Sequence, residues 1–198
     1  TPGGGTNDLI VVNGTLSIGD ELDFVITPLT GSLAAGTYTL MKSTTLSLTS
    51  PYDSASANLV LVEARGLSGD TIQADGNDIT LTSLGGTATP GSIVWAGTPA
   101  LNNWDVHLTQ NWKLSGSPDY FYPLDNVTFD DTGSGTIAMP VVVNPGSMTF
   151  NNNKTNYTFT QNQATFVTGD GGLTLNGKGT VTLQNPNSFT GDVTVNNG

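Results

Sequence analysis

The sequence predicts an all-β protein that combines solenoid-type strands with an antiparallel β insertion. Apolar residues alternate with Thr, Ser and Asn along most of the 198 residues, which is the period of a β-strand. Runs rich in Gly, Asn and Asp cut this alternation into short segments. No segment shows ten residues of helical periodicity, so we expect no real helix.

Residues 1–50 are expected to contribute solenoid-type strands after a flexible lead-in at residues 1–5. Apolar pairs stand at Leu9 and Val11 and, seven residues later, at Leu16 and Ile18. Turn signals separate these pairs, as they do in short successive strands around a coil.

Residues 51–90 are expected to form an antiparallel β meander and a linker. A break at residues 51–56 precedes three short apolar runs, which are separated by two to five turn residues. The stretch GGTATPGS, residues 85–92, is the strongest linker candidate, and we place a domain boundary there.

The second half divides into a Trp-rich β segment at residues 91–133 and a β-helix repeat segment at residues 134–198. The first contains all three Trp residues, and the second alternates strands with Asn-rich turns. Three strands begin between Leu173 and Val193, too short a span for a packed sheet but suitable for one coil of a solenoid. A β-hairpin explains Leu173 to Leu183 equally well.

The last residues also carry a family resemblance. Residues 173–198, LTLNGKGTVTLQNPNSFTGDVTVNNG, resemble the autotransporter-associated β-strand repeat of bacterial surface passengers. The matching positions are Gly177, Gly179, Leu183, Asn187, Phe189, Thr190, Gly191, Val195 and Gly198. Two further regions, residues 7–42 and 93–131, contain stretches similar to segments that accompany such repeats. The resemblance implies a right-handed parallel β-helix outside the cell, and it implies architecture and location more than activity.

The charge balance excludes several kinds of partner. Five Lys and Arg oppose sixteen Asp and Glu, giving a net charge of −11. We therefore expect no nucleic-acid partner, because phosphate contacts require clustered basic residues, and no attraction to anionic membranes. No apolar run is long enough to insert into a bilayer. The absence of Cys excludes disulfides and a Cys nucleophile.

Few residues suggest catalysis. His107 alternates with Asp105, so the two would share one side of a strand and Asp105 could orient a base. No positioned nucleophile accompanies them, and a surface histidine is the favoured interpretation. Two carboxylates could cleave a sugar polymer, but neighbours such as Asp130 and Asp131 point to opposite faces. A lyase would also need basic residues, and Arg65 is the only arginine.

Two further sites are candidates for binding. Calcium accepts Asp and Asn oxygens in turns, and the weak candidates are Asp75, Asp78, Asp130 and Asp131; solvated turn acids are the favoured alternative. Exposed aromatic rings could stack on a glycan. The candidates are Trp104 and Trp112, grouped with Trp95, Tyr120, Phe121 and Tyr122, and a small core beside a sheet is the favoured alternative.

The sequence therefore predicts a non-enzymatic structural module of a bacterial extracellular or cell-surface protein, without a cofactor unless calcium binds. A glycan-binding adhesin module and a β-helical polysaccharide-degrading enzyme are the alternatives. Strand patterns begin near the first residue and run to the last without a cap, so we expect self-association of copies head to tail or in tandem, as in a fibre.

Overall fold

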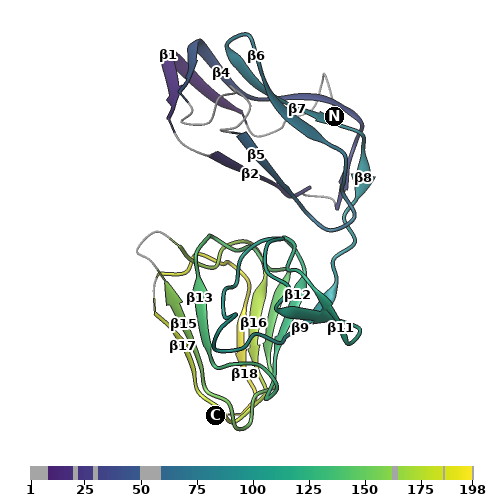
Figure 1. Cartoon of the computed structure of the whole chain (residues 1–198), viewed down its shortest axis with the longest axis vertical. Helices are drawn as coiled ribbons and strands as arrows, with labels where there is room; N and C mark the ends of the chain where they lie inside the picture. The colour runs from purple at the N-terminus through teal and green to yellow at the C-terminus, as the bar shows by residue number, and fades with distance from the viewer. Residues whose placement is uncertain are drawn as a thin grey trace. The chain divides into compact units, whose positions relative to one another are not determined.

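The computed structural model describes residues 9–19, 22–28, 31–49, 59–161, 165–184 and 186–197, and its regular structure there consists of β-strands only. The all-β prediction is confirmed over these ranges, in which no helix could cross a bilayer. The lead-in at residues 1–5 and the break at residues 51–56 lie outside them. The chain forms two compact units, Thr1–Thr89 (unit 1) and Pro90–Gly198 (unit 2) (Figure 1).

Unit 1 contains a four-stranded sheet in the order β1-β4-β7-β6. Its strands are β1 (Ile10–Ile18), β4 (Gly36–Leu48), β6 (Thr71–Asp75) and β7 (Asp78–Ser83). β1 runs parallel to β4, whereas β7 runs antiparallel to both β4 and β6. The predicted antiparallel pairing is therefore present between β6 and β7.

Two smaller pairings complete unit 1. The strands are β2 (Leu22–Ile26) with β5 (Leu59–Glu63), and β3 (Ser32–Leu33) with β8 (Gly86–Thr87). β5, which the sequence places in the antiparallel meander, instead pairs in parallel with β2. Alternation cannot reveal this, because it fixes which side chains face the core but not which strand lies alongside.

Unit 2 contains a seven-stranded sheet in the order β11-β10-β9-β12-β14-β16-β18. The strands are β9 (Ser92–Trp95), β10 (Trp112–Leu114), β11 (Ser117–Asp119), β12 (Asn126–Phe129), β14 (Ser147–Phe150), β16 (Gly172–Leu175) and β18 (Val193–Val195). All neighbours from β9 to β18 are parallel, and the β10–β11 hairpin adds to β9 antiparallel. Among the strands of the Trp-rich segment, the antiparallel pairs are β10 with β11 and β10 with β9.

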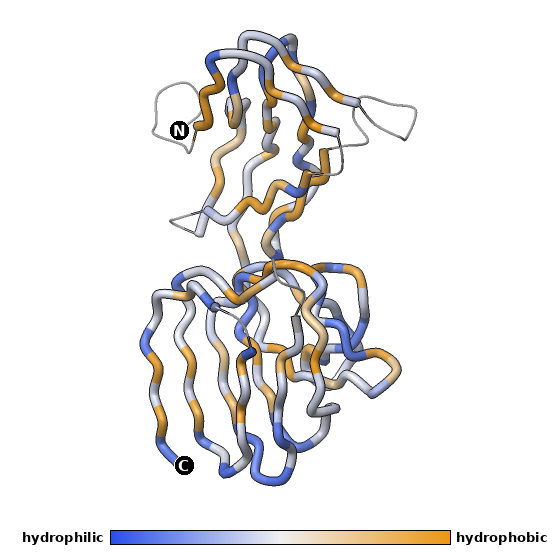
Figure 2. The backbone as a smooth tube through the Cα atoms, turned by 90° about the vertical axis from the view of Figure 1, so that its left-hand side faces the viewer, coloured by the Kyte–Doolittle hydropathy of each residue, from blue (hydrophilic) through white to orange (hydrophobic). Residues whose placement is uncertain are grey.

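A second parallel sheet in unit 2 joins β13 (Thr136–Met139), β15 (Tyr157–Gln161) and β17 (Val181–Leu183). β16 and β17 belong to different sheets, so the alternative of a hairpin over residues 173–183 is wrong. Successive passes of the chain lie side by side in Figure 2, and the pass that ends at the C-terminus is outermost in the row.

The strands of the two parallel sheets alternate along the chain from β12 to β18. In the seven-stranded sheet, Asn126 is paired with Ser147, and Ser147 with Gly172. In the second sheet, Tyr157 of the intervening β15 is paired with Val181. Each short pass of the chain thus contributes one strand to the first sheet and one to the second.

The core of unit 2 is built from the inward-facing positions of both sheets. Phe129 and Phe150 are register partners whose rings stack at 4.8 Å. Phe159, from the second sheet, packs edge-on against both rings. The side chains of paired residues on neighbouring strands point to the same face of the sheet. The aromatic rings therefore form a continuous column inside the unit.

Candidate functional site

The two tryptophans predicted to stack on a glycan lie in the core. Trp104 is 0% exposed and Trp112 is 1% exposed, and their ring centroids are 5.4 Å apart. A stacking platform needs an exposed ring face, which neither residue has. Both side chains cover the end of the aromatic column on the side of the β10–β11 hairpin, where they pack against Phe129.

Asp105 does not orient His107. Asp105 is buried, and its two carboxylate oxygens accept hydrogen bonds from the backbone N–H and the hydroxyl of Thr109. His107 is exposed and has a positive φ of 52°. Its ring centroid lies 5.1 Å from that of Tyr120 and 4.5 Å from that of Tyr122. We call His107, Tyr120 and Tyr122 the aromatic trio.

The sequence included both tyrosines of the trio in its aromatic group, but could not separate them from the core residues. Phe121 lies between them and is fully buried, as strand-like alternation requires. Tyr120 and Tyr122 are half-buried and keep part of their rings at the surface.

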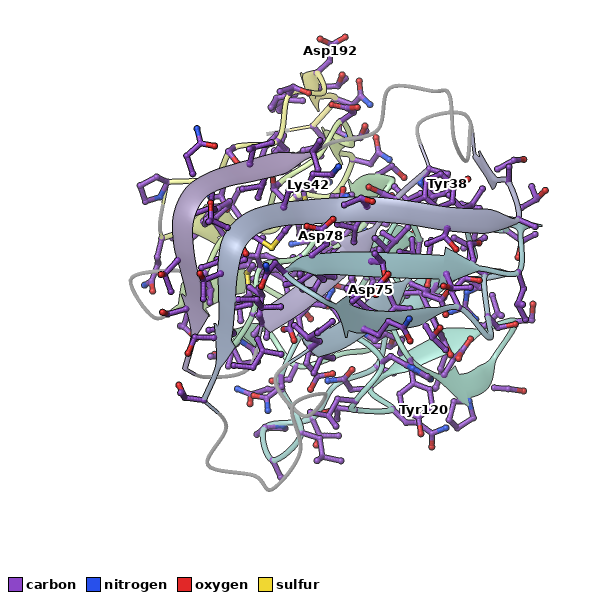
Figure 3. The ribbon with its side chains drawn as sticks, turned by 90° about the horizontal axis from the view of Figure 1, so that it is seen from above. Tyr38, Lys42, Asp75, Asp78, Tyr120 and Asp192 are labelled. Carbon is purple, nitrogen blue, oxygen red and sulfur yellow. The ribbon has the colours of Figure 1, made fainter. Side chains whose placement is uncertain are left out.

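The calcium candidates Asp75 and Asp78 are cross-strand partners at the β6–β7 turn (Figure 3). On its other side Asp78 is paired with Lys42 of β4. Within the described part of the chain, no three Asp, Glu or His side chains come close enough together to hold a metal ion.

The candidate Asp131 acts within the fold. Its Oδ1 accepts hydrogen bonds from the backbone N–H groups of Asn153, Lys154 and Thr155, at 2.9, 2.8 and 2.9 Å. These donors, led by Thr155 and Lys154, and the charge of Lys154 hold the pKa of Asp131 below its usual value. The carboxylate therefore orders a turn in the next pass of the chain.

The neighbouring candidate Asp130 has separate partners. Its carboxylate accepts hydrogen bonds from the N–H and hydroxyl of Thr132, and its carbonyl accepts one from the Tyr157 hydroxyl at 2.6 Å. Burial, with the charges of Asp130 and Asp131, raises the pKa of Tyr157. Asp130 and Asp131 thus have different hydrogen-bond partners and form no shared site.

A carboxyl pair in unit 1 was missed by the sequence analysis. Glu63 at the end of β5 lies against Asp70, and burial followed by repulsion from Asp70 raises the pKa of Glu63. Asp70 accepts a hydrogen bond from the Leu84 N–H at 2.8 Å. No sequence signal joins the two acids, one of which ends β5 while the other lies in the connection just before β6. Asp70 is close enough to raise the pKa of Glu63, so the two carboxyls lack the gap in which two such groups act on opposite sides of a sugar bond.

The clearest unpartnered feature of unit 2 is the outer edge of β18. We call residues Val193–Asn196 the C-terminal edge. β18 is the last strand of its sheet, so no described strand pairs with its outer side. Val193 and Val195 continue the inward rows of Leu173 and Leu175, yet they are 60% and 59% exposed. Apolar groups at core positions are therefore left in water.

An amide ladder runs along the surface to this edge. Asn176 donates from Nδ2 to Oδ1 of Asn151 at 3.0 Å, and Asn196 donates from Nδ2 to Oδ1 of Asn176 at 2.7 Å. Asn176 and Asn196 each donate to the asparagine of the preceding strand, so the ladder has a direction and ends at Oδ1 of Asn196.

The residues of the repeat-like motif have local structural roles. A Cβ on Gly177 would collide with the backbone carbonyl of Asn152, and one on Gly191 would lie 2.5 Å from the backbone of Gly171. Asn187 accepts a hydrogen bond on Oδ1 from the Val167 N–H at 3.0 Å. These positions bring successive passes into close contact, which a side chain would prevent at the glycines.

Unit 1 has a comparable free edge. We call residues Ile10–Asn13 of β1 the N-terminal edge. β1 ends the order of its sheet, so its outer side has no partner among the described strands. Ile10 is 54% exposed and Val11 is 58% exposed.

Comparison of the chain with family models, with curated proteins and with solved structures gave no match.

Proposed function

We propose that unit 2 is a right-handed parallel β-helix and that the chain is a non-enzymatic structural module of a bacterial extracellular or cell-surface protein. The observation that supports this most is the pair of parallel sheets in unit 2, to which each short pass of the chain adds one strand apiece. Regular stacking of short passes is the pattern of a solenoid, in which each pass rests on its neighbours. The handedness and the location come from the resemblance of residues 173–198 to passenger repeats.

The surface chemistry suits a structural role. A threonine occupies the same outward-facing position on four neighbouring parallel strands. These residues are Thr128, Thr149, Thr174 and Thr194. Hydroxyl and amide ladders support neighbouring strands along a stack, and do so without the charge pairs that depend on ionic strength. A long module outside the cell then needs neither disulfides nor a bound ion.

Surface labelling of intact cells that produce the chain tests this function. An antibody against the purified chain should label unbroken cells or the culture fluid, and externally added protease should remove that signal. Recovery of the chain only from the interior of broken cells, with a cytoplasmic marker protein, would show that the location is wrong.

A glycan-binding module is the second candidate, and the aromatic trio is the observation that favours it. Partly exposed tyrosine rings can pack on the apolar face of a sugar. On a glycan array, Tyr120→Ala and Tyr122→Ala should each abolish a signal that the unaltered chain gives. Absence of any signal from the unaltered chain would remove this candidate. Trp104 and Trp112 are unsuitable for this test because truncating buried rings perturbs the core.

We propose no catalytic role, because the carboxylates that suggested one have structural partners. Asp131 orders a turn, and Asp105 accepts a hydrogen bond from Thr109. Incubation of the chain with a panel of polysaccharides should release no reducing ends. Sustained release that tracks the purified chain would favour the polysaccharide-degrading alternative.

A further inference from the structure

We propose that the C-terminal edge of one copy pairs in parallel with the N-terminal edge of a second copy, with Val193 opposite Ile10 and Asn196 opposite Asn13. This inference rests on the proposed role as a structural module and defines how copies would join.

The first support is a shared sequence pattern. Four of the described strands share a four-residue pattern: an apolar residue, any residue, a second apolar residue and then Asn. Among the described strands this pattern occurs only in β1 or where β14, β16 and β18 end. The segments are Ile10–Asn13, Met148–Asn151, Leu173–Asn176 and Val193–Asn196. The last three are consecutive neighbours in the parallel sheet of unit 2. β1 therefore carries the pattern that the next strand of that sheet would need.

The second support is that both edges carry apolar side chains at matching places, of which Val193, Val195 and Ile10 are exposed and Val12 is half-buried. In the proposed register, Val193 meets Ile10 and Val195 meets Val12, so the inward rows of unit 2 continue onto the second copy. Thr194 meets Val11 on the outer face. Pairing would remove from water side chains that are more than half exposed in the single chain.

The third support is the direction of the amide ladder. Oδ1 of Asn196 accepts no hydrogen bond from a described residue, while its Nδ2 is bonded to Asn176. Asn13 is exposed and directly follows Val12, at the point where the register of β1 shifts, and it would occupy the next place in the amide ladder. Its Nδ2 could donate to Asn196 just as Asn196 donates to Asn176. The opposite order of copies would not continue this chain of donors.

The contact is heterologous, because two different surfaces of the same chain meet. Each edge also offers backbone N–H and C=O groups, which strand addition satisfies. A heterologous contact that does not close into a ring produces a filament. Pairing of these two edges would therefore extend the assembly by one copy at a time.

Cysteine trapping tests the register directly, since the chain has no Cys of its own. The full chain carrying Thr194→Cys and Val11→Cys places the thiols on register partners. Neighbouring strands lie about 4.8 Å apart, within the Cα separation of a disulfide. Mild oxidation should give a ladder of oligomers that a reductant returns to single chains.

The matched control is the full chain carrying Thr194→Cys and Thr15→Cys. Thr15 is exposed like Val11, but it lies beyond the register shift that follows Val12 in β1, so it is not opposite Thr194 in the proposed register. We expect its oligomer yield to be at least tenfold lower, with both variants giving the circular dichroism of the unaltered chain. Adding Val195→Asp to the chain that carries Thr194→Cys and Val11→Cys should abolish its disulfide-linked oligomers.

Three results would overturn the proposal: equal yields from the two cysteine pairs, no oligomers from either, or a disulfide formed only within single chains. Each leaves the surface-labelling result untouched. Labelling on the cell surface without disulfide-linked oligomers would retain the structural role and reject this contact. Disulfide-linked oligomers without surface labelling would retain this contact and reject the cell-surface role.

Discussion

At the scale of single residues, two carboxylates show how the same chemical group can act in opposite senses. Asp131 accepts three backbone N–H groups and has a lowered pKa, so its contribution to stability is present above the unfolded pKa and is lost as the pH falls through the folded one. Glu63 has a raised pKa because it is buried beside Asp70. Its contribution is present below the unfolded pKa and is lost as the pH rises through the folded one.

Glu63→Gln should therefore stabilise unit 1 at neutral pH. The amide keeps the shape of the side chain and removes the charge that burial and Asp70 disfavour. We expect calorimetry to show a melting temperature of unit 1 that is a few degrees higher at pH 7, with the gain vanishing below about pH 4, where the unaltered Glu63 is protonated.

Asp23→Asn is the control for this prediction, because it removes one negative charge from an exposed site in the same unit. An equal gain from both variants would attribute the effect to net charge. A loss of stability from Glu63→Gln at pH 7 would contradict the assignment of Glu63 and Asp70 as a repelling pair.

At the scale of elements, the contact between successive passes is the most demanding feature of unit 2. Gly177→Ala puts a methyl group against the Asn152 carbonyl, and backbone cannot give way as a flexible side chain can. We expect a loss of about 1–3 kcal/mol in the free energy of unfolding, the range for overpacked sites. Urea unfolding followed by Trp fluorescence measures it, because all three Trp lie in unit 2.

Gly19→Ala is the comparison. A Cβ there meets only the Thr49 hydroxyl, at 3.5 Å, which is an ordinary contact. It should leave the Trp-detected transition unchanged. A Gly177→Ala chain that unfolds at the same urea concentration as the unaltered chain would mean that the passes are not in such close contact.

Alternation sufficed to predict the class of the fold, because it directly records which residues face a core. It also placed strands such as β16 at Leu173 and Leu175, but the two short strands predicted at Leu9–Val11 and Leu16–Ile18 are wrong, because β1 is one strand from Ile10 to Ile18. It could not assign β5 to a parallel partner, because pairing is decided by contacts far apart in the sequence. The β-helix arrangement of unit 2 stays a prediction.

The candidate sites were harder to predict for the same reason. A tryptophan in the sequence looks the same whether its ring ends in a core, as Trp104 does, or at the surface. The Glu63–Asp70 pair arises only when β5 and the following turn come together. The strand patterns of β1 and β18 are visible in the sequence, whereas their places at the ends of their sheets depend on which strands pair.

At the scale of the whole molecule, net charge and edge chemistry act against each other. Each copy carries −11, so two copies repel at long range. The paired edges, in contrast, contain only apolar and uncharged polar residues, at Ile10–Asn13 and Val193–Asn196. Salt screens the repulsion and does not weaken apolar contact.

Association should therefore strengthen as salt concentration rises. The screening length falls from about 30 Å at 0.01 M to about 3 Å at 1 M ionic strength, so light scattering should show a larger mean mass in 1 M sodium chloride than in 0.01 M at equal protein concentration. The Val195→Asp chain should stay monomeric at both, because screening cannot restore an apolar contact that a carboxylate has replaced. If the mass instead falls with salt, opposite charges hold the copies together, and the uncharged edges of β1 and β18 are not where they meet.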